Sequence, residues 1–354
     1  MVERYAWNRV QFGVLMILRV WTILAIVISG SHFLGQNVTS LPAYVPAHRV
    51  TGTIRSWGSP QMATLMKLWE SGFRRVQPGV EFEDRLKGTA SAVGGLYAER
   101  ADIALLGRDI WPAEIQAFAS IEGYGPTTVQ VATGSFDVPK ATYALMVFVQ
   151  KENPLTQLSL AHLAEIFGSD DVSSEGGPSR WGEVGLTGGW ADRPIHRYAF
   201  NLENDKALVF RGIVFSKTRR WDCRIHEFSD SVSGDSLDAG QQILNALGKD
   251  RYGIAISNVH YSTPDTKVLA LSKHKDGPFI SPTKETVQSR EYPLARSIHI
   301  VINRDPGKPL DPDVLEFLRY VLSREGQHDV VSEGNYLSLT DELVRSERKA
   351  LGIE

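Results

Sequence analysis

From Val50 onward, short apolar strands alternate with amphipathic helices, and this alternation constrains the fold more than any other feature. Each predicted strand ends in a glycine, and the first predicted helix carries apolar residues at helical spacing. The predicted strands cover 51–58, 80–88 and 101–107, and the predicted helices cover 60–79 and 90–100. This series is typical of an α/β domain with a largely parallel sheet. In such sheets, ligands bind beyond the carboxyl ends of the strands, where the helices begin.

A second unit of the same kind begins near Tyr143, and the chain then returns to the first unit at its C-terminus. The predicted strands here cover 144–150 and 193–200, and the predicted helices cover 158–169, 205–215, 311–327 and 339–351. We therefore predict a discontinuous first lobe at residues 50–140 and 265–354. Residues 141–264 form an inserted second lobe, and a ligand cleft lies between the two.

The N-terminus differs from the body of the chain. A short, net positive stretch up to Arg9 precedes an apolar run from Val10 to Gly30, which together predict a secretory signal. The run is also close to the length of a membrane span, so an uncleaved anchor within residues 1–31 is the alternative, although Arg19 interrupts it. The Pro-rich residues 32–49 are then a linker, and the folded body is expected to be periplasmic or extracellular.

Charge and cysteine content exclude several classes of function. The net charge of -3, without a long basic run after residue 50, gives no basis for nucleic-acid binding, so a bound anion must be held by local geometry. The one cysteine, Cys223, cannot form an internal disulfide and is interpreted as a buried structural thiol. The nine histidines form no HxxxH or HxH pair, so neither a metal centre nor a cofactor is expected.

Three turns of the first lobe, each from a strand into a helix, combine a glycine with hydroxyl or charged residues. They are Gly58-Ser59-Pro60-Gln61, Gly88-Thr89-Ala90-Ser91 and Gly107-Arg108-Asp109. A helix N-terminus exposes unpaired N–H groups and a partial positive charge, and adjacent hydroxyls complete a cradle for an oxyanion. The alternative is that these hydroxyls only cap their helices.

Arg108 and Asp109 suggest which anion is bound. A guanidinium offers paired donors to an oxyanion, and a neighbouring carboxylate can accept the proton of a monohydrogen anion. Sulfate has no such proton, so this pair would favour phosphate, unless the two residues merely form a surface ion pair. In the second lobe, Arg197 lies in the predicted strand 193–200 and would point into the cleft, with a purely structural arginine as the alternative.

Signals for catalysis are weak. The chain has no GxSxG, Walker A or GxGxxG motif, and no local motif supplies a triad partner for His196 or His226. We therefore expect that the protein is not an enzyme. A hydrolase on the same two lobes is the rival hypothesis, and it would need a metal cluster or an activated nucleophile.

Three motifs lie in the C-terminal part of the chain: Tyr292–Arg296 (YPLAR), Leu322–Gln327 (LSREGQ) and Gly334–Leu337 (GNYL). On these motifs the chain resembles the periplasmic phosphate-binding proteins of bacterial ABC transporters, and the resemblance extends over roughly residues 50–340. Similar stretches at 152–169 and 87–109 add to it. It implies a type II periplasmic-binding-protein fold, with two α/β lobes that close on a ligand.

The resemblance also implies a set of site residues. By position, the phosphate-binding hydroxyl of the second loop is Ser91, with Thr89 in the same turn, and the proton-accepting aspartate is Asp109. The second-lobe arginine is Arg197, and the first-loop residues are Ser59 and Gln61.

One loop departs from the pattern of the family. Where the family has Ser-Gly-Thr before a helix, this chain has Asn201-Leu202-Glu203-Asn204-Asp205, and Asn204 is nearest to the missing serine. Glu203 and Asp205 would be poor neighbours for a dianion, and Arg108 replaces a small residue as a compensating charge.

The function that follows is capture of a small oxyanion, phosphate first, by a monomer that passes it to ABC permease membrane subunits. The alternative is a degenerate family member that binds another ligand or acts in signalling or scaffolding.

Overall fold

The computed structural model describes residues 38–139, 141–170, 177–216, 219–230 and 238–353. The predicted signal or anchor at residues 1–31 lies outside these residues, as does the first part of the predicted linker. Over the part of the chain that is described, no helix is both long and apolar enough to cross a membrane.

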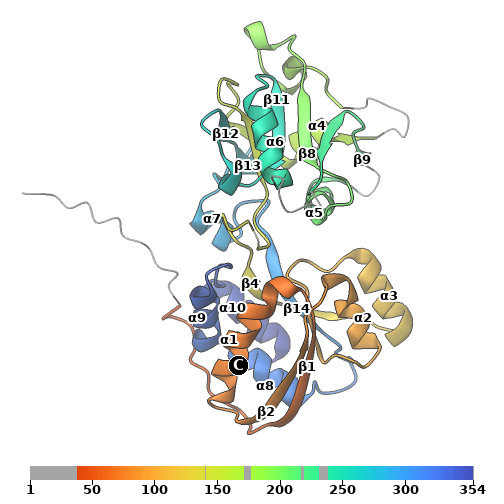
Figure 1. Ribbon diagram of the computed structural model, residues 1–354, viewed down its shortest axis with the longest axis vertical. Coiled ribbons are helices and arrows are strands. Elements are labelled where there is room, and N and C mark those ends of the chain that lie inside the picture. Colours follow the sequence, from red (N-terminus) through yellow and green to blue (C-terminus); the bar gives the residue numbers. More distant parts are fainter. Residues whose placement is uncertain (1–37, 140, 171–176, 217–218, 231–237, 354) are drawn as a thin grey trace, which may run out of the picture. The chain divides into compact units, whose positions relative to one another are not determined.

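The first lobe is built on a five-stranded sheet with the order β2-β1-β3-β14-β4 (Figure 1). Its strands are β1 (Thr51–Gly58), β2 (Gly79–Arg85), β3 (Ile103–Leu105), β4 (Thr127–Thr133) and β14 (Ser297–Ile302). β1 is parallel to β2 and β3, whereas β14 is antiparallel to β3 and β4. The three predicted strands of the first unit are therefore confirmed as parallel neighbours, within a sheet that is mixed as a whole.

Helices cover both faces of this sheet. They are α1 (Ala63–Arg74), α2 (Ala92–Tyr97), α3 (Pro112–Glu122), α8 (Pro312–Val321), α9 (Arg324–Glu333) and α10 (Asp341–Leu351). Alternate residues of a strand point to opposite faces. Ile103 and Leu105 of β3 accordingly join the core under α1, α8 and α9, whereas Ala104 joins the core under α2 and α3. The predicted helix 311–327 is two helices, because the Ser323 hydroxyl caps a new one.

The second lobe holds a sheet with the order β10-β8-β11-β5-β12. Its strands are β5 (Met146–Gln150), β8 (His196–Phe200), β10 (Ile225–Phe228), β11 (Gly253–Ser257) and β12 (Thr266–Val268), and its main helices are α4 (Leu160–Phe167), α5 (Asp205–Val214) and α6 (Ala239–Gly248). β8 is parallel to β10 and β11, and β5 is antiparallel to β11 and β12. The two-lobed α/β fold of type II is thus confirmed.

The return to the first lobe comes later in the chain than the predicted residue 265. β12 pairs with β5, and β13 (Ala270–Ser272) pairs with β6 (Gln157–Ser159), so these strands belong to the second lobe. Tyr292 and Leu294 also lie in the second lobe's core. The sequence does not reveal where the chain returns to the first lobe, because the short strands 266–268 and 270–272 could pair with the sheet of either lobe. The chain rejoins the first sheet only at β14.

Two chain segments that connect the lobes are bonded to each other. The Gly134 N–H donates to the Arg296 carbonyl at 2.8 Å, and the Leu145 N–H donates to the Leu294 carbonyl at 3.1 Å. Arg296 therefore lies at the crossing between the lobes, immediately before β14.

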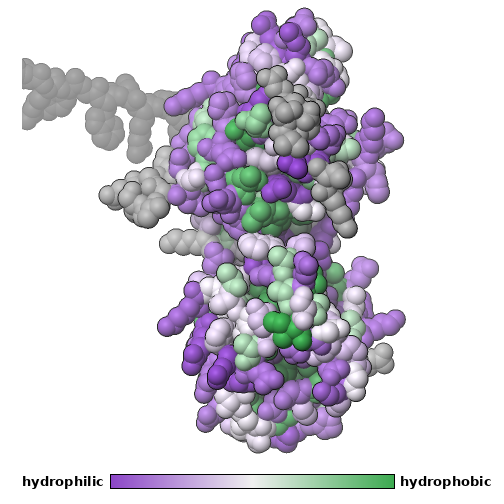
Figure 2. Space-filling model, turned by 90° about the vertical axis from the view of Figure 1, so that its right-hand side faces the viewer, coloured by the Kyte–Doolittle hydropathy of each residue, from purple (hydrophilic) through white to green (hydrophobic). Residues whose placement is uncertain are grey.

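Cys223 corrects one sequence interpretation. It is exposed, in the turn between β9 (Arg220–Trp221) and β10, and is not a buried thiol. The face seen in Figure 2 is predominantly hydrophilic, with hydrophobic residues gathered in small separate clusters.

Candidate functional site

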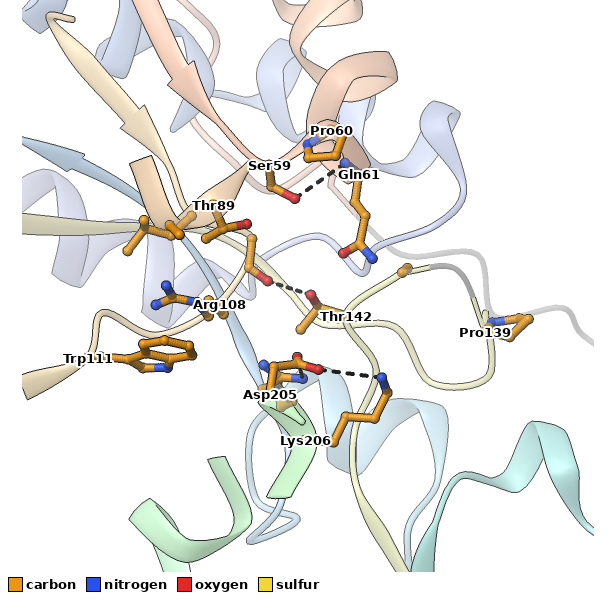
Figure 3. Close-up of a pocket in the computed structure, with 15 residues that line it drawn as sticks. Ser59, Pro60, Gln61, Thr89, Arg108, Trp111, Pro139, Thr142, Asp205 and Lys206 are labelled. Atoms are coloured by element: carbon orange, nitrogen blue, oxygen red, sulfur yellow. Dashed lines mark hydrogen bonds and ion pairs between the residues drawn. The ribbon is translucent and has the colours of Figure 1, made fainter. Parts of the chain in front are cut away.

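A pocket of about 350 Å³ lies where the first lobe's strand-to-helix turns meet the N-terminus of α5 (Figure 3). Four predicted site residues line it: Ser59, Gln61, Thr89 and Arg108. Four further polar residues join them, which the sequence did not indicate as ligands: Thr142, Asp205, Lys206 and Arg296. The pocket therefore takes groups from both lobes and from the crossing between them.

The first wall of the pocket is the turn after β1. The buried Ser59 precedes Pro60 at the start of a short 3-10 helix, and its hydroxyl accepts from the Gln61 N–H at 3.3 Å. Gly58 is required here, because a Cβ at this position would lie 2.1 Å from the Leu105 carbonyl oxygen. The close approach of β1 and β3 brings Ser59 beside the next turn, at Gly107.

The guanidinium of Arg108 is held by a partner that the sequence analysis missed. Its two terminal nitrogens donate to both carboxylate oxygens of Glu114, at 2.8 and 2.9 Å. The same group lies 3.8 Å from the centroid of the Trp111 ring. Glu114 stands at the third position of α3, after Pro112 at the first, which is a recognisable helix-start signal. Arg108 thus lines the pocket with its charge largely compensated.

Two other predicted residues of the first lobe do not line the pocket. Asp109 is half-exposed and pairs with His299, whose Nδ1 lies 3.4 Å from its carboxylate. Burial lowers the pKa of His299. The Ser91 hydroxyl is exposed and donates to the Gly88 carbonyl at 3.1 Å. The role expected of Asp109 therefore has no support from its position.

The two predicted second-lobe ligands also lie elsewhere. Arg197 is buried, and its guanidinium donates to the carbonyls of Ile166, Ile195 and Pro178, all in its own lobe. Burial lowers its pKa to about 10. Asn204 caps α5, and its side-chain oxygen accepts from the Lys206 N–H at 3.0 Å. The contacts of Arg197 thus agree with the alternative of a purely structural arginine. The charged second-lobe residues of the pocket are others.

Arg296 supplies the strongest donors of the pocket. Its side chain is 1% exposed, and its Nη1 donates to Asp205 Oδ2 at 3.3 Å. Among the described residues, its Nε and Nη2 are buried without a hydrogen-bond partner. Leaving a buried charged donor unpaired is costly, so these two nitrogens identify a place where an acceptor is missing.

Asp205 and Lys206 form the second-lobe edge of the pocket. Lys206 Nζ lies 3.4 Å from Asp205 Oδ1 and 5.3 Å from the centroid of the Phe200 ring. Burial alone would raise the pKa of Asp205, but the charges of Lys206 and Arg296 outweigh it and hold the pKa below its ordinary value. The site therefore pairs one carboxylate with two cations, and one positive charge is left over for an anion.

Hydroxyl groups complete the lining. Thr142 Oγ1 donates to the Gly107 carbonyl and lies beside the turn of Arg108, and Thr89 begins the turn before α2. Hydroxyls can rotate to donate or accept, so they suit an oxyanion of either protonation state. In the part of the chain that is described, no group of histidine, cysteine or acidic residues could hold a metal ion.

These features define a class of protein: two α/β lobes that contribute polar groups to one small pocket at the crossing between them. The profile of the PBP superfamily domain matches residues 45–325. The phosphate-binding protein PstS of Pseudomonas aeruginosa is 30% identical over 315 residues, which cover 89% of this chain and 91% of that protein. This chain belongs to the PBP superfamily and, within it, to the PstS-like phosphate-binding proteins.

Solved structures show the same fold. PstS from Borrelia burgdorferi aligns over 81% of this chain and 99% of its own, with a TM-score of 0.56 and 17% identity. An ABC-type phosphate transport receptor from Vibrio cholerae aligns over 80% of this chain and 99% of its own, with a TM-score of 0.52 and 17% identity. At these identities the likeness concerns the fold alone.

Proposed function

We propose that this protein captures inorganic phosphate outside the cytoplasm and delivers it to the membrane subunits of an ABC transporter. The observation that carries the ligand class is Arg296, a buried guanidinium with two nitrogens that lack an acceptor in the pocket. A tetrahedral oxyanion presents two oxygens at the spacing of a guanidinium fork. Membership of the PstS-like proteins supports phosphate as the first candidate.

The phosphate would be bound by residues from three parts of the chain. Arg296 and Lys206 supply charge, and the hydroxyls of Ser59 and Thr89 supply neutral hydrogen bonds. Thr142 lines the pocket, but its hydroxyl proton is donated to the Gly107 carbonyl. Gln61 and Arg108 line the same pocket and complete its polar wall. Ser91, Asp109, Arg197 and Asn204 are not part of the proposed site.

We assign to Asp205 the role that the sequence suggested for Asp109. Asp205 lines the pocket beside Arg296, and its lowered pKa keeps it ionised at neutral pH. A carboxylate in this position accepts the proton of monohydrogen phosphate but repels sulfate, which has no proton to donate.

The protein acts as a receptor and not as an enzyme, because binding and release of the anion require no covalent step. It is exported as a monomer, either freed from residues 1–31 or anchored by them, and this location follows from the apolar run at Val10–Gly30. Both the permease partner and the export route belong to the proposal.

Titration calorimetry with phosphate, and with sulfate as competitor, tests the proposed function. Arg296→Ala should weaken phosphate binding by roughly 30-fold to several thousand-fold, since loss of one partner of a desolvated charge pair costs ~2–5 kcal/mol. Arg304→Ala is the control, because Arg304 donates to the Ala350 carbonyl at 3.1 Å, away from the pocket. Phosphate binding within threefold of the parent by Arg296→Ala would overturn the proposed site.

A further inference from the structure

A second and larger cavity lies next to the anion pocket. Its volume is about 570 Å³, in the range of cavities that enclose small organic ligands. Its walls come from the start of α3 and from α5 with the turn that follows it. The wall residues that matter here are Trp111, Pro112, Leu208, Arg211, Gly212 and Phe215. Trp111 lines both cavities, so they share a wall.

Helix α5 also connects the two cavities. Asp205 and Lys206, in its first turn, line the anion pocket, and Leu208 and Gly212 line the second cavity. Residues three and four positions apart lie on one face of a helix, so Asp205, Leu208 and Gly212 form one continuous row. A ligand held at the first turn of α5 can therefore extend along the same helix face.

The second cavity is mainly apolar but contains unused donors. Leu208 and Phe215 are only half-buried, so their apolar surface is open to this space. Trp111 Nε1 and Arg211 Nε are buried, and neither has a hydrogen-bond partner among the described residues. Apolar walls with a few polar groups are the usual lining of a site for an organic molecule.

We propose that the two cavities form one elongated site for an organic phosphonate or phosphate monoester. The phosphoryl group binds Arg296 and Lys206, and its apolar, preferably aromatic, substituent lies against Trp111, Leu208 and Phe215. This inference rests on the proposed function, because it uses the same anion pocket. It extends the proposed ligand from inorganic phosphate, which is too small to reach the second cavity, to organic compounds that carry a phosphoryl group.

Gly212 gives a way to fill the second cavity without touching the anion pocket. A Cβ at Gly212 would meet no atom within 4 Å, and the residue lies inside α5, where other side chains are tolerated. Gly212→Phe should place its ring in the cavity. Gly212→Ala is the matched control, since it changes the same helix position and leaves the cavity open.

Titration calorimetry of the full chain with inorganic phosphate, methylphosphonate and phenylphosphonate tests the proposal. The two phosphonates differ only in the substituent, so their affinity ratio measures what the second cavity contributes. We expect phenylphosphonate to bind at least about tenfold more tightly than methylphosphonate, as burial of an aromatic ring warrants. Gly212→Phe should remove this advantage and leave phosphate affinity within about twofold, and Gly212→Ala should retain it.

The outcomes separate this proposal from the proposed function. If phosphate binds and neither phosphonate does, or if the two phosphonates bind equally, the elongated site is overturned and phosphate capture stands. A loss of phosphate and phenylphosphonate affinity together in Gly212→Phe also overturns it. If phenylphosphonate binds and phosphate does not, the elongated site stands and phosphate capture fails. If no ligand binds, both are overturned.

Discussion

Replacing Asp205 by asparagine should change the choice between phosphate and sulfate more than it changes phosphate affinity. The side chain keeps its size, but the pocket loses its one carboxylate and gains an amide that can donate. Because the pKa of Asp205 is lowered in the folded protein, the carboxylate is charged above its ordinary pKa and neutralises only as the pH falls through the lowered value. At pH 7 it is therefore ionised when either anion arrives.

The structure gives the size of this effect. Asp205 Oδ2 lies 3.3 Å from Arg296 Nη1, so an anion on the other nitrogens of the same guanidinium would be a close neighbour of the carboxylate. Two like charges ~4 Å apart repel by about 4 kcal/mol at an effective dielectric constant of ~20. Since Asp205 is 43% exposed, solvent screening reduces this to about 1 kcal/mol, and it acts on both anions because both carry two negative charges. The acceptor left without a proton disfavours sulfate alone, by about 1–3 kcal/mol.

The missing proton alone predicts that the phosphate-to-sulfate affinity ratio falls by roughly 5-fold to 150-fold in Asp205→Asn. Calorimetry of both anions at pH 7 measures the ratio directly. Asp109→Asn is the matched control, because it makes the same chemical change at a half-exposed residue outside the pocket. An unchanged phosphate-to-sulfate ratio in Asp205→Asn would refute the reasoning. A similar fall of the ratio in Asp109→Asn would also refute it, and would make Asp109 the acceptor of the phosphate proton, as the sequence suggested.

Three further predictions follow from the same contacts. Arg197→Ala should lower the melting temperature but leave phosphate affinity within about threefold, since Arg197 donates to three second-lobe carbonyls. A large loss of affinity would show that it reaches the ligand. Glu114→Gln should tighten phosphate binding several-fold at low salt, because the Arg108 guanidinium would lose the carboxylate that neutralises its charge. An unchanged phosphate affinity in calorimetry would contradict this. Saturating phosphate should reduce the radius of gyration in small-angle scattering, and identical curves under demonstrated binding would argue against closure of the lobes.

The sequence predicted the fold well because strand and helix periodicity are local properties. The strand at 51–58 has its predicted bounds, whereas the strand predicted at 101–107 covers only Ile103–Leu105. The helix predicted at 60–79 is a 3-10 turn at Pro60–Met62 followed by α1, which ends at Arg74. Some of the predicted site residues line the candidate pocket for the same reason. Ser59 directly follows β1 and Thr89 lies four residues after β2, so their places near the sheet edge depend mainly on local order. Residues whose role depends on the arrangement of lobes could not be found in this way.

Arg197 and Arg296 show where local reasoning stops. Both are buried arginines beside or within apolar strands, and the local sequence of neither shows whether its side chain faces a pocket. The Arg197 side chain lies within its own lobe, where its guanidinium donates to three backbone carbonyls. Arg296 stands at the crossing between the lobes, and that crossing is set by pairings between strands that are far apart in sequence.

The position of Arg296 also suggests how binding is coupled to movement of the lobes. Its backbone is fixed at the crossing by the bond from the Gly134 N–H, while its side chain meets Asp205 at the start of the second-lobe helix α5. An anion on the free nitrogens of Arg296 would therefore contact a residue of the crossing and, through Lys206, the second lobe as well. The first-lobe hydroxyls of Ser59 and Thr89 line the same pocket. A ligand that binds the closed arrangement more tightly than the open one shifts the equilibrium between them toward the closed form. The shift in free energy equals the difference between the two binding free energies. We therefore expect the lobes to close only on an anion that the first lobe, Arg296 and Lys206 can contact together. A larger ligand would allow closure only if its organic substituent extends into the cavity beside Trp111.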